Sequence, residues 1–175
     1  MTNLQNSKIT LRAPEPEDLE IAYQWENNTD VWEVSNTIAP ISRYILKQYL
    51  QTAHLDIYTN KQLRLIIEEN QTKKAIGAID LFDFDPFHNR AGVGILINNN
   101  SDRKKGFAAE ALKTLIDYSF TYLNLKQLYC NITTDNKASI KLFENAGFVV
   151  SGNKKSWIKS ASGWKDELFL QLINE

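Results

Sequence analysis

A short basic segment carries the first residues in this chain whose types and spacing could do chemistry. Its members are Arg103, Lys104, Lys105, Gly106, Phe107 and Ala108. Three cations and a glycine are unfavourable at the start of a helix, because the dipole there favours anions and glycine costs about 1 kcal/mol relative to alanine. A bound anion would explain the arrangement, since free amides would point at it, Gly106 would let the backbone approach and the cations would supply charge.

Two common phosphate-binding motifs do not fit this segment. A P-loop needs Gly-Lys followed by Ser or Thr, whereas Gly106 is followed by Phe107, and the dinucleotide fingerprint G-x-G-x-x-G is absent. The remaining candidate for the anion is a diphosphate that is bound without a metal ion. The alternative is an ordinary helix start, in which Ser101 or Asp102 caps the helix and the cations form a solvated surface patch.

A strand and a helix must position the basic segment. An apolar run from Ala91 to Ile97 predicts a strand, and the residues from Asn98 to Asp102 form a polar turn. The helix is predicted from apolar positions at helical spacing, which are Ala108, Ala111, Leu112, Leu115, Ile116, Phe120 and Leu123. The order strand, turn, helix would place the anion at the start of the helix, beside the end of the strand.

A second motif follows at residues 136–148, after a predicted strand at residues 127–133. It reads NKASIKLFENAGF from Asn136 to Phe148. This motif resembles the pattern N-x-x-(A/S)-I-x-L-(Y/F)-E-K-x-G-F of the GNAT acetyltransferases, and the basic segment is similar to the Arg/Gln-x-x-Gly-x-Gly/Ala loop that binds acyl-CoA pyrophosphate in that family. The resemblance covers essentially the whole chain. It is nearest to the group that contains ribosomal-protein N-terminal acetyltransferases and bacterial spermidine acetyltransferases.

The resemblance implies an α/β (α+β) GNAT fold, with a mixed central sheet of six to seven strands flanked by about four helices. It implies acetyl-CoA as co-substrate, with the pyrophosphate on residues 103–108. The pantetheine arm would lie along Ile95, Leu96 and Ile97 like an added strand, with a backbone N–H contacting the thioester oxygen. Asn136 and Ser139 are then expected beside the CoA arm.

The chain departs from the family pattern at two catalytic positions. Many relatives carry a glutamate base where this chain has Gly92, and many carry a tyrosine that protonates the thiolate where it has Phe143. Phenylalanine cannot donate a proton, and we take Ser139, one turn earlier in the helix, as the substitute acid. Candidates for the base, in falling order of preference, are Asp80, Asp83, Glu33 and Glu167.

An acidic and aromatic segment at residues 80–85 favours a cationic acceptor. Along an extended strand Asp80, Phe82 and Phe84 would face one way, with Asp83 and Asp85 facing the other. Carboxylates and rings attract ammonium groups, which favours a polyamine or an aminosugar. A solvated hairpin tip is the alternative.

Acceptor contacts are also expected from the first two helices and their connection. We name Trp32, Glu33, Asp83 and Asp85 as candidate substrate-binding residues, with Trp25 and Glu26 behind them. The competing functions are acetylation of a protein N-terminal amine and a catalytically impaired acyl-CoA-binding module.

The remaining pattern predicts the order strand, two helices, three strands, helix, strand, helix, two strands. The first strand is expected at residues 8–12, a helix from Leu19 that ends at Asn27-Asn28, a loop at residues 31–41 and a helix from Ser42 to Ala53. A hairpin is predicted from the strands at residues 63–69 and 75–82, and bulged C-terminal strands from residues 148–158 and 164–173.

Length and charge bound the classes of function. The chain has 175 residues and a net charge of -1, which predicts one domain over residues 1–175 and no general nucleic-acid surface. The single cysteine, Cys130, is expected to be a buried thiol, and His54 and His88 lack neighbours at metal-ligand spacing. No apolar run reaches membrane-spanning length, so we expect a cytoplasmic enzyme without metal; a homodimer is left open.

Overall fold

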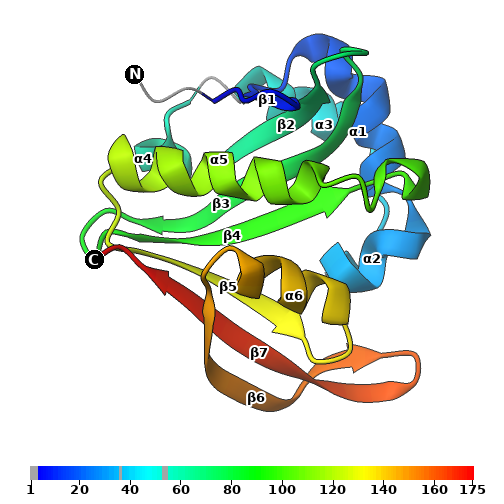
Figure 1. Cartoon of the computed structure of the whole chain (residues 1–175). Helices are drawn as coiled ribbons and strands as arrows, with labels where there is room; N and C mark the ends of the chain where they lie inside the picture. The colour runs from blue at the N-terminus through cyan, green and yellow to red at the C-terminus, as the bar shows by residue number, and fades with distance from the viewer. Residues whose placement is uncertain (1–3, 36, 53–54) are drawn as a thin grey trace.

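Figure 1 shows a computed structural model of the chain, which describes residues 4–35, 37–52 and 55–175. Its centre is one seven-stranded sheet in the order β1-β2-β3-β4-β5-β7-β6. The β4 and β5 strands pair in parallel and the other neighbouring pairs are antiparallel. The strands are β1 (Ile9–Arg12), β2 (Leu63–Glu69), β3 (Ala75–Asp85), β4 (Arg90–Ile97), β5 (Gln127–Thr133), β6 (Val149–Ser160) and β7 (Gly163–Ile173).

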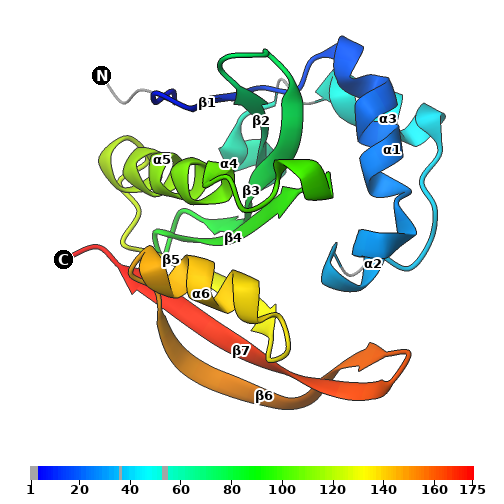
Figure 2. The ribbon, with the colours of Figure 1, turned by 45° about the vertical axis from the view of Figure 1, so that its right-hand side comes forward.

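The helices lie on both sides of this sheet. They are α1 (Leu19–Glu26), α2 (Thr29–Ser35), α3 (Arg43–Thr52), α4 (Ile57–Asn60), α5 (Phe107–Thr121) and α6 (Lys137–Asn145), with the 3-10 turns η1 (Pro16–Asp18) and η2 (Asn100–Asp102). The α5 and α6 helices cover one face, while α1, α2 and α3 lie on the other side (Figures 1 and 2). The mixed sheet of seven strands confirms the predicted fold class, and the structure has two helices more than the four predicted, α2 and α4.

The core forms where the apolar face of α5 meets the sheet. Leu112 and Leu115 of α5 are fully buried, as are Ile79 and Leu81 of β3. Alternate residues of the same strands face the opposite way, because successive strand side chains point to opposite faces. Asp80 of β3 is at such a position, and its pairing partner on β2 is Arg64. Both side chains line a cavity under α1 and α3.

The sheet opens between β4 and β5. The two strands pair only at Arg90 with Gln127, Ala91 with Leu128 and Gly92 with Tyr129. Beyond Gly92, β4 stays with β3 and β5 stays with β7, and the two arrows diverge in Figure 1. The backbone of β4 therefore has a free edge from residue 93 to residue 97, which is the stretch expected to hold the pantetheine arm.

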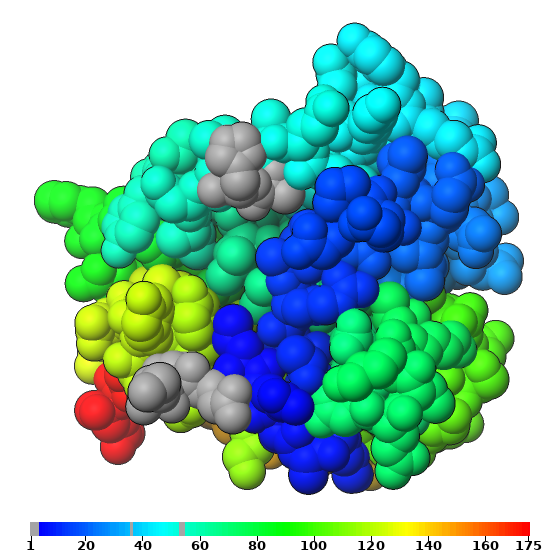
Figure 3. Space-filling view, turned by 90° about the horizontal axis from the view of Figure 1, so that it is seen from above, coloured from blue at the N-terminus to red at the C-terminus, as the bar shows by residue number. Residues whose placement is uncertain are grey.

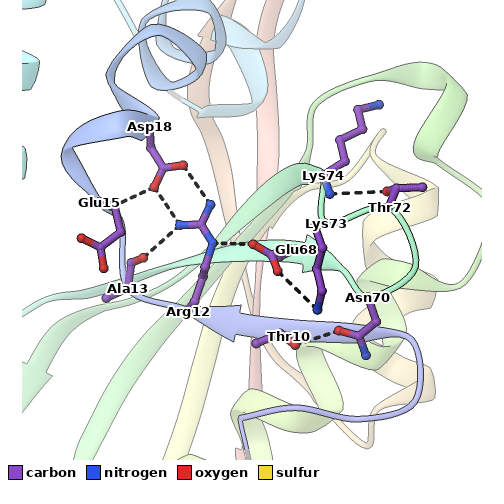
Figure 4. Close-up of polar contacts among 10 residues, drawn as sticks. All are labelled: Thr10, Arg12, Ala13, Glu15, Asp18, Glu68, Asn70, Thr72, Lys73 and Lys74. Carbon is purple, nitrogen blue, oxygen red and sulfur yellow. Dashed lines mark hydrogen bonds and ion pairs between the residues drawn. The ribbon is translucent and has the colours of Figure 1, made fainter.

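The N-terminal strand is tied to the rest of the fold by a polar network (Figure 4). The guanidinium of Arg12 donates to both carboxylate oxygens of Asp18 at 2.8 and 2.9 Å and to Glu68 at 2.8 Å. Burial alone would raise the pKa of Asp18, but the bonds from Arg12 and the Glu15 amide lower it. Seen from above, β1 lies between α5 and the helices of the opposite face (Figure 3). The bonds of Arg12 to Asp18 also fix where α1 begins, because Asp18 is the N-cap of that helix.

One sequence prediction for the helical region needs correction, and one is confirmed. The segment predicted as a loop at residues 31–41 contains α2, because Asn28 both follows the end of α1 and caps the next helix, its side-chain oxygen accepting from the Asp30 amide at 3.1 Å. The third helix does start after Ser42, whose hydroxyl accepts from the Ile45 amide, and its predicted last member, Ala53, lies outside the described residues.

The alternation predicted for residues 80–85 also breaks. Asp83 has φ of 48°, and the pairing of β3 with β4 shifts between Phe82 and Asp85. This bulge turns Phe84 into the core, where it is 4% exposed and packs edge-on against Tyr58. Phe82 alone of the two rings lines the cavity with Asp80.

Candidate active site

The basic segment forms a turn that leaves the first amides of α5 available. Lys104 and Gly106 have φ of 62° and 85°, and Gly106 is the N-cap of α5. In the described part of the chain, no side chain hydrogen-bonds to the amides at this cap. The alternative cap is wrong, because Asp102 belongs to η2 and its carboxylate binds Lys74 at 2.8 Å. An exposed helix N-terminus without a side-chain cap is suited to a diphosphate.

The cations around this turn have different tasks. Arg103 folds back, and its Nε donates to the carbonyl oxygen of Ile97 at 2.9 Å, so that it holds the end of β4 against the turn. Lys104 is exposed, and Lys105 lies 3.5 Å from Asp102. A further cation comes from the N-terminal segment, since the Lys8 Nζ lies 3.4 Å from where a Gly106 side chain would begin. No sequence pattern predicts this position for Lys8, which is nearly 100 positions away in the chain.

The wedge between β4 and β5 contains a cavity of about 100 Å³. It is lined by Glu33, Val34, Val93, Gly94, Ile95, Cys130, Asn131, Ile132, Thr133, Asn136, Ser139, Phe143 and Glu167. Ile95 and Ser139, which come from the two sequence motifs, therefore meet across this cavity. We name it the wedge cavity.

Ser139 is held at the start of α6. The side-chain oxygen of Asn136 accepts from the Ser139 amide at 3.2 Å and caps the helix. Phe143 is 2% exposed and packs edge-on against Phe148, so the position where relatives carry a tyrosine serves the core. Ser139 is half-buried and its hydroxyl can donate a proton, which keeps it as our candidate acid.

A larger cavity of about 550 Å³ lies between the sheet and α1, α2 and α3. We name it the acceptor cavity. It is lined by four carboxylates, Asp18, Glu26, Asp80 and Glu167, and by two cations, Arg64 and Lys154. Trp25 and Trp157 line it as well.

Arg64 holds two of these carboxylates. It donates to Glu26 at 2.7 Å and to both oxygens of Asp80 at 2.7 and 3.2 Å. Burial alone would lower the pKa of Arg64, but Asp80 and Glu26 raise it overall, and a guanidinium does not lose its proton in proteins. Asp80, the first choice for the base, therefore has both oxygens engaged by a permanent cation.

Glu33 and Trp32 lie on α2, apart from Asp80. Glu33 lines the wedge cavity and pairs with Lys165, which also pairs with Asp135 at 2.7 Å. The bonds to Asp135 and Glu33 raise the pKa of Lys165. Trp32 donates its indole N–H to the backbone oxygen of Glu26 at 2.9 Å, so that its ring is bonded to α1, and it is not among the lining residues of either cavity.

The structure separates Asp83 and Asp85 of the acidic segment from the two cavities. Asp83 and Asp85 lie at the closed end of the wedge, outside the linings of both cavities. Asp85 accepts from two backbone amides and pairs with Arg90 at 3.3 Å. Asp83 accepts a long 3.5 Å bond from Tyr129, whose pKa is raised by burial and then by Asp83. Of this segment's carboxylates only Asp80 lines the acceptor cavity, and the other carboxylates of that lining, Asp18, Glu26 and Glu167, come from other elements.

Phe82 fills the space beside Gly92, where many relatives carry the glutamate. A Cβ at Gly92 would lie 2.3 Å from Cε2 of Phe82 and 2.4 Å from its Cζ. The ring lines the acceptor cavity and packs edge-on against Tyr129, with centroids 5.9 Å apart. The Phe82 ring therefore occupies the space that a glutamate side chain at position 92 would need.

Two further kinds of site can be examined within residues 4–35, 37–52 and 55–175, a cysteine nucleophile and a metal centre. Burial raises the pKa of the Cys130 thiol to about 12, which leaves it protonated and a poor nucleophile. Within these described ranges, no three His, Cys, Asp or Glu side chains gather in a way that could hold a metal ion. No helix there is long and apolar enough to cross a membrane.

One unsatisfied atom at the end of β4 suits the pantetheine arm of CoA. Asn98 is 7% exposed and lines the acceptor cavity, and among the described residues its Oδ1 has no hydrogen-bond partner. A buried acceptor without a partner costs about 1–3 kcal/mol, and pantetheine carries amide N–H donors that could satisfy it. The free edge of β4, the turn at Gly106 and Asn98 together fit acyl-CoA.

Comparisons with known proteins agree with this geometry. Residues 8–149 match the acetyltransferase (GNAT) domain family. A spermidine N(1)-acetyltransferase of Vibrio cholerae is 32% identical over 148 residues, which cover 85% of this chain and 83% of that protein. The crystal structure of spermidine N-acetyltransferase from Vibrio cholerae in complex with CoA and spermine has a TM-score of 0.84 at 28% identity, over 96% of both chains. A dodecameric structure of the Vibrio cholerae enzyme in an intermediate state has a TM-score of 0.80 at 29% identity, over 96% of this chain and 95% of that one.

Proposed function

This chain belongs to the GNAT acetyltransferase family and is an acetyl-CoA-dependent N-acetyltransferase, and from that premise we propose that its acceptor is a small polycationic amine of the spermidine class. The observation that carries the proposal is the acceptor cavity, where four carboxylates stand against two cations and two tryptophans. An alkylammonium chain fits such a lining through charge and cation–π attraction. The similar Vibrio cholerae enzyme crystallised with CoA and spermine supports the same class.

The residues that would hold acetyl-CoA follow from the geometry. The turn at residues 103–108 would bind the diphosphate through the amides after Gly106, with Lys8, Lys104 and Lys105 supplying charge. The free edge of β4 would bind the pantetheine arm, with a backbone N–H of residues 95–97 polarising the thioester. Bound acetyl-CoA supplies the activated acetyl group, and Ser139 would protonate the departing thiolate.

The proposal extends to the organisation of the protein. We infer that residues 1–175 act as one domain and that the enzyme works in the cytoplasm, where acetyl-CoA is available. We infer self-association as well, with a homodimer as the smallest unit. The dodecameric structure of the similar Vibrio cholerae enzyme supports assembly.

Thiol release from acetyl-CoA with a panel of amines tests the acceptor class. The panel contains spermidine, spermine, an aminosugar, a peptide with a free N-terminus and a neutral alcohol as the blank. The proposal predicts the highest kcat/KM for spermidine or spermine. A preference for the peptide would indicate that the acceptor is a protein N-terminal amine instead. Tight CoA binding without turnover on any amine would favour a binding module.

A further inference from the structure

One carboxylate lies where the two cavities meet. Six residues line both the wedge cavity and the acceptor cavity, namely Val34, Val93, Gly94, Ile95, Asn131 and Glu167. Among the described residues, Glu167 is therefore the acidic side chain that both linings share. An acceptor amine must pass this junction to reach a thioester held in the wedge.

Glu167 is buried and held by strands on both sides. It lies on β7, paired with Thr133 of β5 and Lys154 of β6. Its side chain is 8% exposed and forms an ion pair with the Lys154 ammonium. A buried carboxylate needs a cation, since leaving it unpaired is strongly unfavourable.

Lys154 differs from the arginines that hold the other carboxylates of the acceptor cavity. Asp18 is held by Arg12, and Glu26 and Asp80 are held by Arg64, through bonds to guanidinium groups with fixed donor geometry. Lys154 is instead a single ammonium on a flexible stem, and 32% of its side chain is exposed.

Lys154 has further partners beside Glu167. Its ammonium donates to Asn131 at 2.8 Å and lies 5.2 Å from the ring centroid of Trp157. The pairing of β6 with β7 is interrupted immediately after Lys154, between Lys154 and Ile158. The side chain can therefore leave Glu167 while it keeps contacts with an amide and an aromatic face.

We propose that Glu167 is the catalytic base and that the acceptor's ammonium takes the place of Lys154 on it. Glu167 removes one proton from the bound ammonium. The neutral nitrogen then attacks the thioester carbonyl, so that a C–N bond forms and the C–S bond breaks. The thiolate leaves with the electron pair and takes a proton from Ser139, which regains one from solvent. The nitrogen loses its remaining surplus proton to solvent and Glu167 releases its own there, so that one proton is released overall.

This inference rests on the proposed function, and it reorders the sequence-based candidates. Asp80 was preferred from the sequence, but both its oxygens accept from Arg64. Glu33 lines the wedge cavity only and is half-exposed on α2. Glu167 was the last choice, because the sequence does not show that β7 passes the open end of the wedge.

Glu167→Gln tests the role of the base, with two amines that differ in basicity. Spermidine is protonated at pH 7, whereas trifluoroethylamine is largely neutral and needs no base before attack. We expect the variant to lower kcat/KM for spermidine by about 10²- to 10⁴-fold and for trifluoroethylamine by less than about threefold. Equal losses on both amines, or no loss on spermidine, would overturn the proposal. A wild-type enzyme that acetylates neither amine would instead refute the proposed function.

Lys154→Met tests the exchange independently of turnover. The variant leaves the carboxylate without its cation, so ethylammonium chloride should raise the Tm of Lys154→Met by several degrees more than the same concentration of sodium chloride. Wild type and the double variant Lys154→Met/Glu167→Gln are the controls, and both should show a smaller difference between the two salts. An equal response of all three proteins would contradict the proposal. Because Glu167→Gln alone is not among them, this test holds even if that variant does not fold.

Discussion

The close packing of Phe82 on Gly92 predicts a strong energetic coupling between the two residues. In Gly92→Ala the new methyl would lie 2.3 to 2.8 Å from three ring carbons, well inside the ordinary contact distance of about 3.5–4.0 Å. The ring must move, and overpacking of this kind costs about 1–3 kcal/mol. In a Phe82→Ala background the methyl has room, and the same substitution should be neutral or should stabilise by up to about 1 kcal/mol, because glycine is unfavourable inside a strand.

A double-mutant cycle measures this coupling through urea unfolding of the four proteins. We expect an interaction free energy of at least about 1 kcal/mol, against about 0.3–0.5 kcal/mol for independent sites. Gly94→Ala is the matched control, since its methyl would lie 3.8 Å from the same ring, an ordinary contact. Additive free energies for Gly92→Ala and Phe82→Ala would refute the conclusion that Phe82 occupies the space of the missing side chain.

Four further outcomes follow from the contacts of single residues. Gly106→Ala should weaken CoA binding by about 5- to 30-fold in a titration, because φ of 85° strains alanine by about 1–2 kcal/mol and the relaxed turn misplaces its amides; unchanged affinity would remove Gly106 from the site. Arg64→Met should lower the free energy of unfolding by about 3–5 kcal/mol, since it leaves two carboxylates without their shared cation; a loss below about 1 kcal/mol would contradict this. Cys130, with its pKa raised to about 12, should react with a thiol reagent at pH 8 at least about 100-fold more slowly in the folded than in the unfolded protein; similar rates would mean the thiol is accessible. The hydrogen bond from Lys74 lowers the pKa of Asp102, so the pair stabilises the fold above the usual carboxyl pKa and loses this as pH falls through the lowered value; Lys74→Met should cost less than about 1 kcal/mol at pH 7 and nothing in strong acid, and a cost that persists in acid would argue against the pair.

The sequence was sufficient where a local pattern decides the structure. The apolar spacing of residues 108–123 predicted α5, and the glycine and cations before it predicted the turn at its start. Local residues also set the two ends of α6, where the Asn136 side chain caps the helix and Gly147 has φ of 96°. These features depend on hydrogen bonds and dihedral angles within a few residues.

The sequence was insufficient where the site depends on contacts between distant elements. Asp83 and Asp85 are predicted to bind the acceptor, but β3 is bulged at Asp83 and neither residue is in the lining of the two cavities. Lys8, just before β1, and Glu167, on β7, reach the two ends of the site from opposite ends of the chain. Their positions follow from the strand order and the opening between β4 and β5, and no spacing in the chain encodes either.

The most direct test of this account is a crystal structure of the protein with CoA bound. The account predicts diphosphate oxygens within hydrogen-bond distance of the backbone amides at residues 104–108, and the sulfur in the wedge beside Ile95. A structure that shows CoA bound elsewhere, with the turn at Gly106 free of phosphate, would contradict it.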